Sequence, residues 1–181
     1  WNDEAELLMI GLKTQDIDYS RAPESNLVFL IDVSGSMFSE DKLPLLQESF
    51  GLLAENLTEK DRISIVTYAA ESEIVLNGVH GDETKKIKKA LAGLEASGRT
   101  HGSDGIETAY ALAEENFIKG GNNRIILATD GDLNVGMTTE EELEELITEK
   151  KETGIFLSVL GFGTGNIKDN KMETLADKGN G

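Results

Sequence analysis

Three short stretches of the chain carry oxygen-bearing side chains that could bind a metal ion. The first is DVSGSM, in which Asp32 is followed by hydroxyls at alternate positions, Ser34 and Ser36. The second is SGRTHG, which contains Thr100, and the third is TDGDLNVG, which contains Asp130. Two carboxylates and three hydroxyls form a hard, all-oxygen set suited to Mg²⁺ or Mn²⁺, which take about six oxygen ligands and retain some water. Five protein oxygens leave room for a donor from outside.

The same residues also have plainer interpretations. Ser and Gly are ordinary turn residues, so the five side chains could be turn and cap groups without a metal. A haloacid-dehalogenase phosphatase would use D-x-D, and Ser34 stands at the second acidic position. The chain contains neither a G-x-S-x-G elbow nor a G-x-x-x-x-G-K-[ST] phosphate loop. A metal-dependent hydrolase of phosphate esters stays an alternative, as does a scaffold domain that binds nothing, but we predict no catalytic residue.

Two further motifs fail on a single residue each. Residues 130–141 imitate a calcium-binding loop, but Val135 stands where an EF-hand needs glycine, and Ca²⁺ is therefore a less favoured ion. GFGTGN, residues 161–166, has Asn166 in place of the last glycine of a dinucleotide-binding loop. Neither segment changes the interpretation of the first three stretches.

Composition limits the classes of function. The 181 residues fit one domain, and 34 acidic against 17 basic residues give a net charge of −17. Phosphate backbones repel such a chain, which argues against nucleic-acid binding. The absence of cysteine removes disulfides, thiolate ligands and a cysteine nucleophile. No apolar run approaches the roughly 20 residues needed to cross a bilayer, so we expect no membrane insertion by this segment.

The elements that must position these residues alternate along the chain. Apolar runs predict strands at 27–33, 62–69, 72–78, 123–129 and 155–163. Helical spacing of apolar residues predicts helices at 42–57, 82–94, 103–117, 138–154 and 168–179. Thr139 and Glu142 can form a capping box, and the Phe and Met residues fall in these patterns and are expected in the core. Apolar strands between amphipathic helices predict a doubly wound α/β fold with a mostly parallel sheet covered on both faces.

Two features of this frame concern its edges. The short gap before 72–78 predicts an antiparallel hairpin with that strand at a sheet edge. Near the N-terminus, an apolar run at 6–13 could be a strand, and 14–26 has the composition of a linker. We therefore expect residues 1–25 to be an N-terminal strand and linker of a flanking region, and residues 26–181 to be the main domain.

The ordered set of D-x-S-x-S after the first strand, a distant Thr in a Gly/Ser-rich loop and an Asp after a later strand resembles the metal-ion-dependent adhesion site of von Willebrand factor type A domains. FLIDVSGSM and ILATDGDLNVG are similar to bacterial members of this family. The resemblance implies a Rossmann-like fold whose last strand and helix are missing after Gly181. It also implies coordination by the hydroxyls of Ser34, Ser36 and Thr100, with Asp32 and Asp130 acting directly or through water.

The resemblance further implies a divalent-cation-dependent, adhesion-type binding module rather than an enzyme. Its partner would be a protein that presents an exposed Asp or Glu, whose carboxylate completes the metal coordination. Arg99, next to Thr100, could grip that carboxylate with two parallel hydrogen bonds. Because the chain begins with Trp1 rather than Met, we expect a longer parent protein, exported or attached to a membrane through segments outside this one.

Overall fold

The computed structural model describes residues 22–69, 71–97, 105–131, 139–163 and 169–181. The expected strand at 6–13 and two predicted site residues, Arg99 and Thr100, lie outside these ranges. The described strands are β1 (Ser25–Asp32), β2 (Arg62–Tyr68), β3 (Ser72–His80), β4 (Asn122–Thr129) and β5 (Ile155–Gly161). The described helices are η2 (Gly35–Phe38), α1 (Leu43–Leu53), η3 (Ala54–Asn56), α2 (Thr84–Ala92), α3 (Gly105–Glu115), α4 (Glu140–Glu152) and α5 (Asp169–Gly179).

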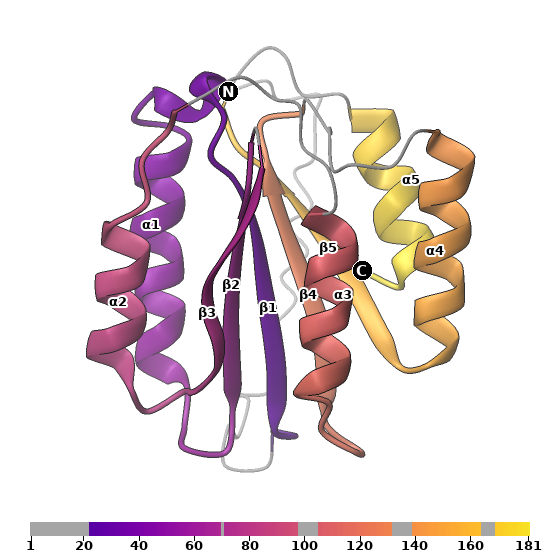
Figure 1. Cartoon of the computed structure of the whole chain (residues 1–181), viewed down its shortest axis with the longest axis horizontal. Coiled ribbons are helices and arrows are strands. Elements are labelled where there is room, and N and C mark those ends of the chain that lie inside the picture. The colour runs from indigo at the N-terminus through magenta and orange to yellow at the C-terminus, as the bar shows by residue number, and fades with distance from the viewer. Residues whose placement is uncertain (1–21, 70, 98–104, 132–138, 164–168) are drawn as a thin grey trace, which may run out of the picture.

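The strands form one sheet in the order β3-β2-β1-β4-β5 (Figure 1). β1 lies parallel to β2 and to β4, and β4 lies parallel to β5. β3 pairs antiparallel with β2 at the edge of the described sheet, as the short hairpin gap predicted. The chain leaves β1 toward β2 on one side and returns to its other side as β4. In open α/β sheets this reversal of strand order opens a crevice at the carboxyl ends of the strands, where ligands bind.

Helices cover both faces of the sheet (Figure 1). This explains the unbroken apolar runs in the central strands, Leu27–Ile31 in β1 and Ile125–Ala128 in β4. Side chains alternate across a strand, so Val28 and Leu30 of β1 face a core shared with α3 and α4. Phe29 and Ile31 face the opposite core, which α1 and α2 complete. The doubly wound α/β prediction is confirmed.

Two local expectations have different outcomes. The capping box at the start of α4 forms as predicted, with Thr139 Oγ1 accepting from the backbone of Glu142 and the Glu142 carboxylate accepting from the backbone of Thr139. The placement of all Phe residues in the core is wrong, because Phe38 is 79% exposed and Phe117 is also exposed. Phe38 ends the short helix η2, of whose four residues Met37 is the buried one.

No described helix has the length and apolar character that a membrane crossing demands.

Candidate metal centre

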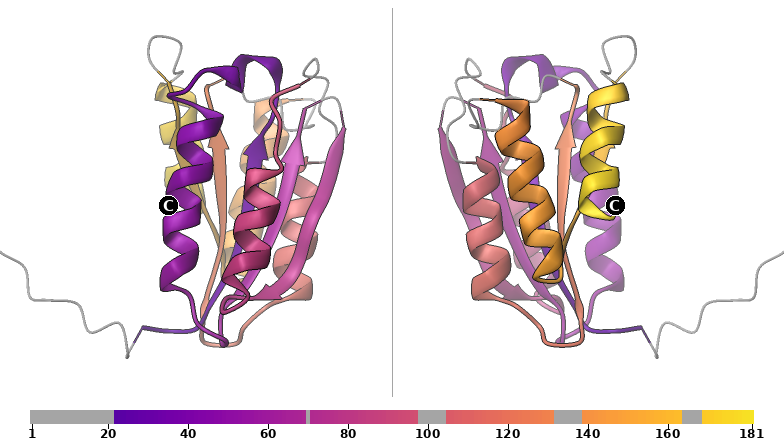
Figure 2. Two further views of the ribbon diagram at one scale, coloured as in Figure 1. Left: turned by 90° about the vertical axis from the view of Figure 1, so that its left-hand side faces the viewer. Right: turned by 90° about the vertical axis from the view of Figure 1, so that its right-hand side faces the viewer.

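The candidate site lies at the edge of the sheet toward which the parallel strands point (Figure 2). Asp32 is the last residue of β1, and Asp130 follows the last residue of β4, Thr129. The parallel register pairs Ile31 with Ala128, so these strand ends are level with each other. The sheet therefore brings two acidic residues from distant parts of the sequence to one edge.

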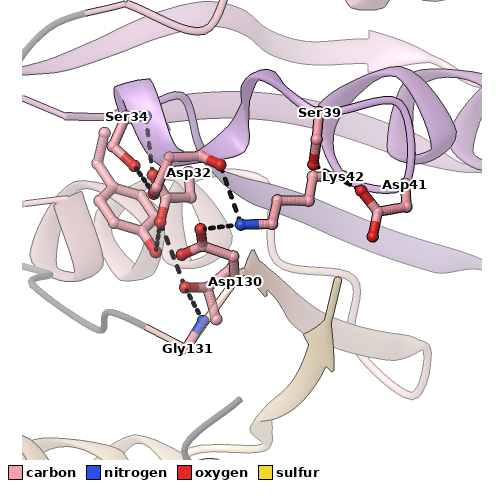
Figure 3. Close-up of polar contacts among 10 residues, drawn as sticks. Asp32, Ser34, Ser39, Asp41, Lys42, Asp130 and Gly131 are labelled. Carbon is pink, nitrogen blue, oxygen red and sulfur yellow. Dashed lines mark hydrogen bonds and ion pairs between the residues drawn. The ribbon is translucent and has the colours of Figure 1, made fainter. Parts of the chain in front are cut away.

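The side chain of Asp32 is held in place from three directions. It is fully buried, and its Oδ1 accepts a hydrogen bond of 2.8 Å from the backbone N–H of Ser34. Its Oδ2 accepts longer bonds from the hydroxyl of Tyr68, at 3.5 Å, and from Oγ1 of Thr129, at 3.3 Å (Figure 3). The Thr129 hydroxyl in turn accepts from the N–H of Gly131 at 3.2 Å. These bonds fix the orientation of the carboxylate.

Burial raises the pKa of the Asp32 carboxyl above its ordinary value, because desolvation disfavours the charged form. The hydrogen bonds from Ser34 oppose this shift, and the negative charge of Asp130 adds to it. Burial also raises the pKa of the Tyr68 hydroxyl well above its usual value, with the Asp32 carboxylate contributing. Tyr68 therefore stays protonated and donates to Asp32. Two neighbouring carboxylates at a buried site favour a cation between them.

The two serines follow Asp32 in the turn that leads into η2. Ser34 is buried and Ser36 is exposed, and their hydroxyl oxygens lie 2.9 Å apart. Alternate positions in this turn thus converge, as the D-x-S-x-S spacing suggested. Ser34 contributes to the floor of the site, whereas Ser36 forms part of its rim.

Asp130 contacts a cationic side chain of the protein itself. Its carboxylate is largely buried, and its Oδ2 lies 2.8 Å from Nζ of Lys42. The same ammonium donates to the backbone carbonyl of Ser36 at 3.0 Å. Figure 3 shows Lys42 reaching across from the segment before α1 to the end of β4. The ammonium of Lys42 thus contacts Asp130 and Ser36, two residues that the sequence predicted to be metal ligands.

The structure brings together four predicted site residues, namely Asp32, Ser34, Ser36 and Asp130. Thr100 and Arg99 lie outside the described residues. Within the described ranges, no three Asp, Glu, His or Cys side chains gather where they could hold an ion. A cation at this edge would therefore depend on hydroxyls beside two carboxylates. That donor chemistry fits a hard divalent ion such as Mg²⁺ or Mn²⁺.

Sequence reasoning missed four residues around the site. Tyr68 and Thr129 each end a strand adjacent to β1, and their role as partners of Asp32 follows from the strand order. A polar residue at the end of an apolar strand was the signal that could have found them. Lys42 and Phe38 carried no such signal, because their positions depend on the path of the turn above the sheet.

A family model for the von Willebrand factor type A domain matches residues 26–181. The chain belongs to this family. It is 45% identical over 181 residues to the uncharacterized protein YfbK of Escherichia coli, a match that covers all of this chain and 32% of YfbK. The chain therefore spans about a third of that bacterial relative's length.

Solved structures share the fold at lower identity. An aerotolerance-related membrane protein of Bacteroides fragilis superposes with a TM-score of 0.68 at 18% identity, covering 87% of this chain and 89% of the other. The manganese-loaded TRAP protein of Plasmodium vivax superposes with a TM-score of 0.63 at 17% identity, covering 86% and 63%. The fold is thus found in a protein that holds a divalent metal. The names of these relatives state no catalytic activity.

Proposed function

We propose that this domain is a divalent-cation-dependent protein-binding module. Asp32, Ser34, Ser36, Thr100 and Asp130 would hold one Mg²⁺ or Mn²⁺, with the carboxylates acting directly or through water. The observation that carries the proposal is the meeting of Asp32 and Asp130 at one buried edge, beside paired hydroxyls and under a cationic group. A metal there would supply an open coordination position and positive charge.

The buried residues of the site would bind the metal, and the exposed residues would contact the partner. Asp32 and Ser34 are buried and held by the hydrogen bonds of the strand ends, so they are preorganised for binding. Ser36 and Phe38 are exposed above them, on the surface that a partner would meet. We infer that a carboxylate of the partner, from an Asp or Glu, completes the coordination. An exposed aromatic side chain beside a charged centre is typical of protein-binding surfaces.

A hollow of about 600 Å³ lies next to this edge, and Val33, between Asp32 and Ser34, forms part of its wall. Leu76 of β3 and Leu94, which follows α2, line it further, together with charged side chains such as Glu73 and Lys89. This groove could receive side chains that flank the partner's carboxylate. The proposal therefore favours a protein ligand over a lone carboxylic acid.

Chelation tests the proposal directly. Partner protein recovered on the immobilised domain in Mg²⁺ should be released by EDTA, because the metal is part of the interface. Excess Mg²⁺ should restore binding, and the partner should lose it when one exposed Asp or Glu is replaced by the corresponding amide. Partner binding that persists in EDTA would contradict the proposal.

Arg99 is proposed to contact the incoming carboxylate. Arg99→Ala should weaken partner binding by about 1 to 3 kcal/mol, the usual range for a hydrogen bond to a charged group. Mg²⁺ affinity of the free domain should hardly change, whereas Thr100→Ala should reduce both affinities. Titration of each variant with Mg²⁺ and then with partner separates the two roles. Equal losses of Mg²⁺ affinity in Arg99→Ala and Thr100→Ala would contradict the separate roles proposed for these two residues.

The location of the parent protein is also a proposal. An aerotolerance-related membrane protein shares the fold, and this likeness supports a location outside the cytoplasm. We infer an extracytoplasmic module, attached or secreted through segments outside residues 1–181, with a function in adhesion rather than catalysis.

A further inference from the structure

Lys42 is built into the candidate metal centre more firmly than a surface lysine usually is. Its side chain is only 19% exposed, and its ammonium contacts two acceptors from different elements. One acceptor is Oδ2 of Asp130, after β4, and the other is the backbone carbonyl of Ser36, in η2. Single exposed ion pairs often contribute nothing measurable, but this one is largely shielded from water and anchored at two points.

The aliphatic part of Lys42 also packs closely against the backbone of another segment. It lies against Gly163, which follows β5 and adopts a φ of +90°. A Cβ atom at this position would stand 2.5 Å from Cε of Lys42, closer than carbon atoms approach in proteins. Glycine therefore both tolerates the backbone conformation and leaves room for the lysine stem. Three separate segments cooperate to place the ammonium on Asp130.

We propose that Lys42 is an intramolecular competitor of the metal ion: its ammonium occupies the cation position at Asp130 in the metal-free domain and must be displaced when a divalent ion binds. This inference rests on the proposed metal site. The ammonium and a divalent ion repel each other, and both need the same carboxylate. Lys42 therefore lowers the affinity of the site for metal.

The need to displace the Lys42 ammonium also affects which ion the site selects. A monovalent cation that replaces the ammonium exchanges one positive charge for another and gains little. A divalent ion brings a second charge to the pair formed by Asp32 and Asp130, which compensates for the lost contacts of the lysine. The tethered ammonium thus favours divalent over monovalent ions. It also supplies a counter-charge to two adjacent carboxylates when no ion is present.

The test compares Lys42→Met with the unmodified chain by calorimetric titration with Mg²⁺. Methionine keeps an unbranched stem and removes the charge. We expect Mg²⁺ affinity to rise by about 10-fold or more, since a hydrogen bond to a charged group has to be broken in the parent chain but not in the variant. In EDTA the variant should melt at a lower temperature, because Asp130 loses its counter-charge. The increase in melting temperature on adding Mg²⁺ should be larger than in the parent chain.

Lys150→Met is the matched control. Lys150 is 20% exposed and pairs with Glu114, so it resembles Lys42 in burial and in having an acidic partner. It lies in the last turn of α4, at the end of the helix away from its capped start. Removing this charge changes the net charge equally but leaves the candidate site intact. Its Mg²⁺ affinity should stay within about 2-fold of the parent chain, because salt screens the interaction between charges that are far apart.

The outcomes separate this inference from the proposed function. Mg²⁺ binding by the parent chain, with equal or weaker binding by Lys42→Met, would overturn the competitor role and leave the metal site standing. An equal rise of Mg²⁺ affinity in Lys150→Met would show that only the net charge matters, and it would also overturn the competitor role of Lys42. Failure of every variant to bind Mg²⁺ or Mn²⁺ would remove both proposals. Mg²⁺ binding detected only in Lys42→Met would support both proposals.

Circular dichroism in EDTA checks that each variant is folded. If Lys42→Met is not folded, Lys42→Gln is used in its place.

Discussion

Asp32→Asn is expected to abolish Mg²⁺ binding while leaving the metal-free domain at least as stable as before. Substitutions that only touch the partners of a metal ligand cost about 10- to 100-fold in affinity, so loss of the charged ligand itself should exceed 100-fold. The amide keeps an oxygen for the N–H of Ser34, and the hydroxyls of Tyr68 and Thr129 can rotate to accept from its NH₂. Calorimetry with Mg²⁺ measures the first effect, and thermal melting in EDTA measures the second.

The stability part of this prediction follows from the raised pKa of Asp32. The folded state binds the Asp32 proton more tightly than the unfolded chain does. Linkage then requires that the contribution of this group to stability is greatest below its ordinary pKa of 3.8 and is lost as pH rises through the raised folded value. At neutral pH the buried charge therefore opposes folding. Asparagine resembles the protonated form and removes that opposition.

Asp61→Asn is the matched control, because Asp61 is a buried carboxylate at the opposite end of the sheet. It precedes β2 and accepts bonds from the backbone N–H groups of Ser25 and Thr58 and from the Thr58 hydroxyl. One of its acceptor oxygens becomes a donor in the amide, so this variant should lose stability and keep its Mg²⁺ affinity. If Asp32→Asn bound Mg²⁺ as well as the parent chain does, the assignment of the site would be wrong.

Phe29→Ala should lower the free energy of unfolding by about 3 to 5 kcal/mol, the usual loss for a large aromatic side chain removed from a core. Phe29 lies in the middle of β1 and is fully buried, with its ring centroid 4.3 Å from that of Phe50 in α1. The substitution would leave a cavity between β1 and α1. Guanidinium denaturation in EDTA, monitored by circular dichroism, measures the effect without a contribution from metal.

The chain provides its own control for this change. Phe38→Ala removes the same atoms from a side chain that is 79% exposed, and it should change stability by no more than about 0.5 kcal/mol. Phe38→Ala should instead weaken partner binding, because Phe38 is exposed in η2, the helix that also carries Ser36 of the candidate site. A loss of stability in Phe29→Ala no larger than that in Phe38→Ala would show that the β1–α1 core is not packed as described.

The sequence predicted the frame of this domain because its strands and helices differ in the period of their apolar residues. β1 and β4 contain the unbroken apolar runs Leu27–Ile31 and Ile125–Ala128, which indicated burial on both faces, and α4 carried its start signal in Thr139 and Glu142. The same frame located Asp32 and Asp130, since residues that follow parallel strands meet at one edge. These inferences needed only local pattern and a general rule of sheet topology.

The surroundings of the site could not be predicted in the same way. The sequence pattern places Lys42 at the start of a predicted helix, six positions after Ser36. Its ammonium nevertheless contacts Asp130, which lies 88 positions further along the chain. The contact depends on the turn of η2 and on the absence of a side chain at Gly163, which no local pattern encodes. Phe38 was misplaced for a related reason, because its exposure depends on where one short helix crosses the sheet.

The pairing of β1 with β4 places Thr129 in contact with Asp32 across 97 positions of the chain. No fragment that lacks this pairing can assemble the two carboxylates, so a cation bound by both would select the completely folded domain. At a free ion concentration 100 times the dissociation constant, such binding stabilises the fold by about 2.7 kcal/mol, and the unfolded population falls roughly 100-fold. The susceptibility of the domain to proteases would then depend on the divalent cation content of its surroundings.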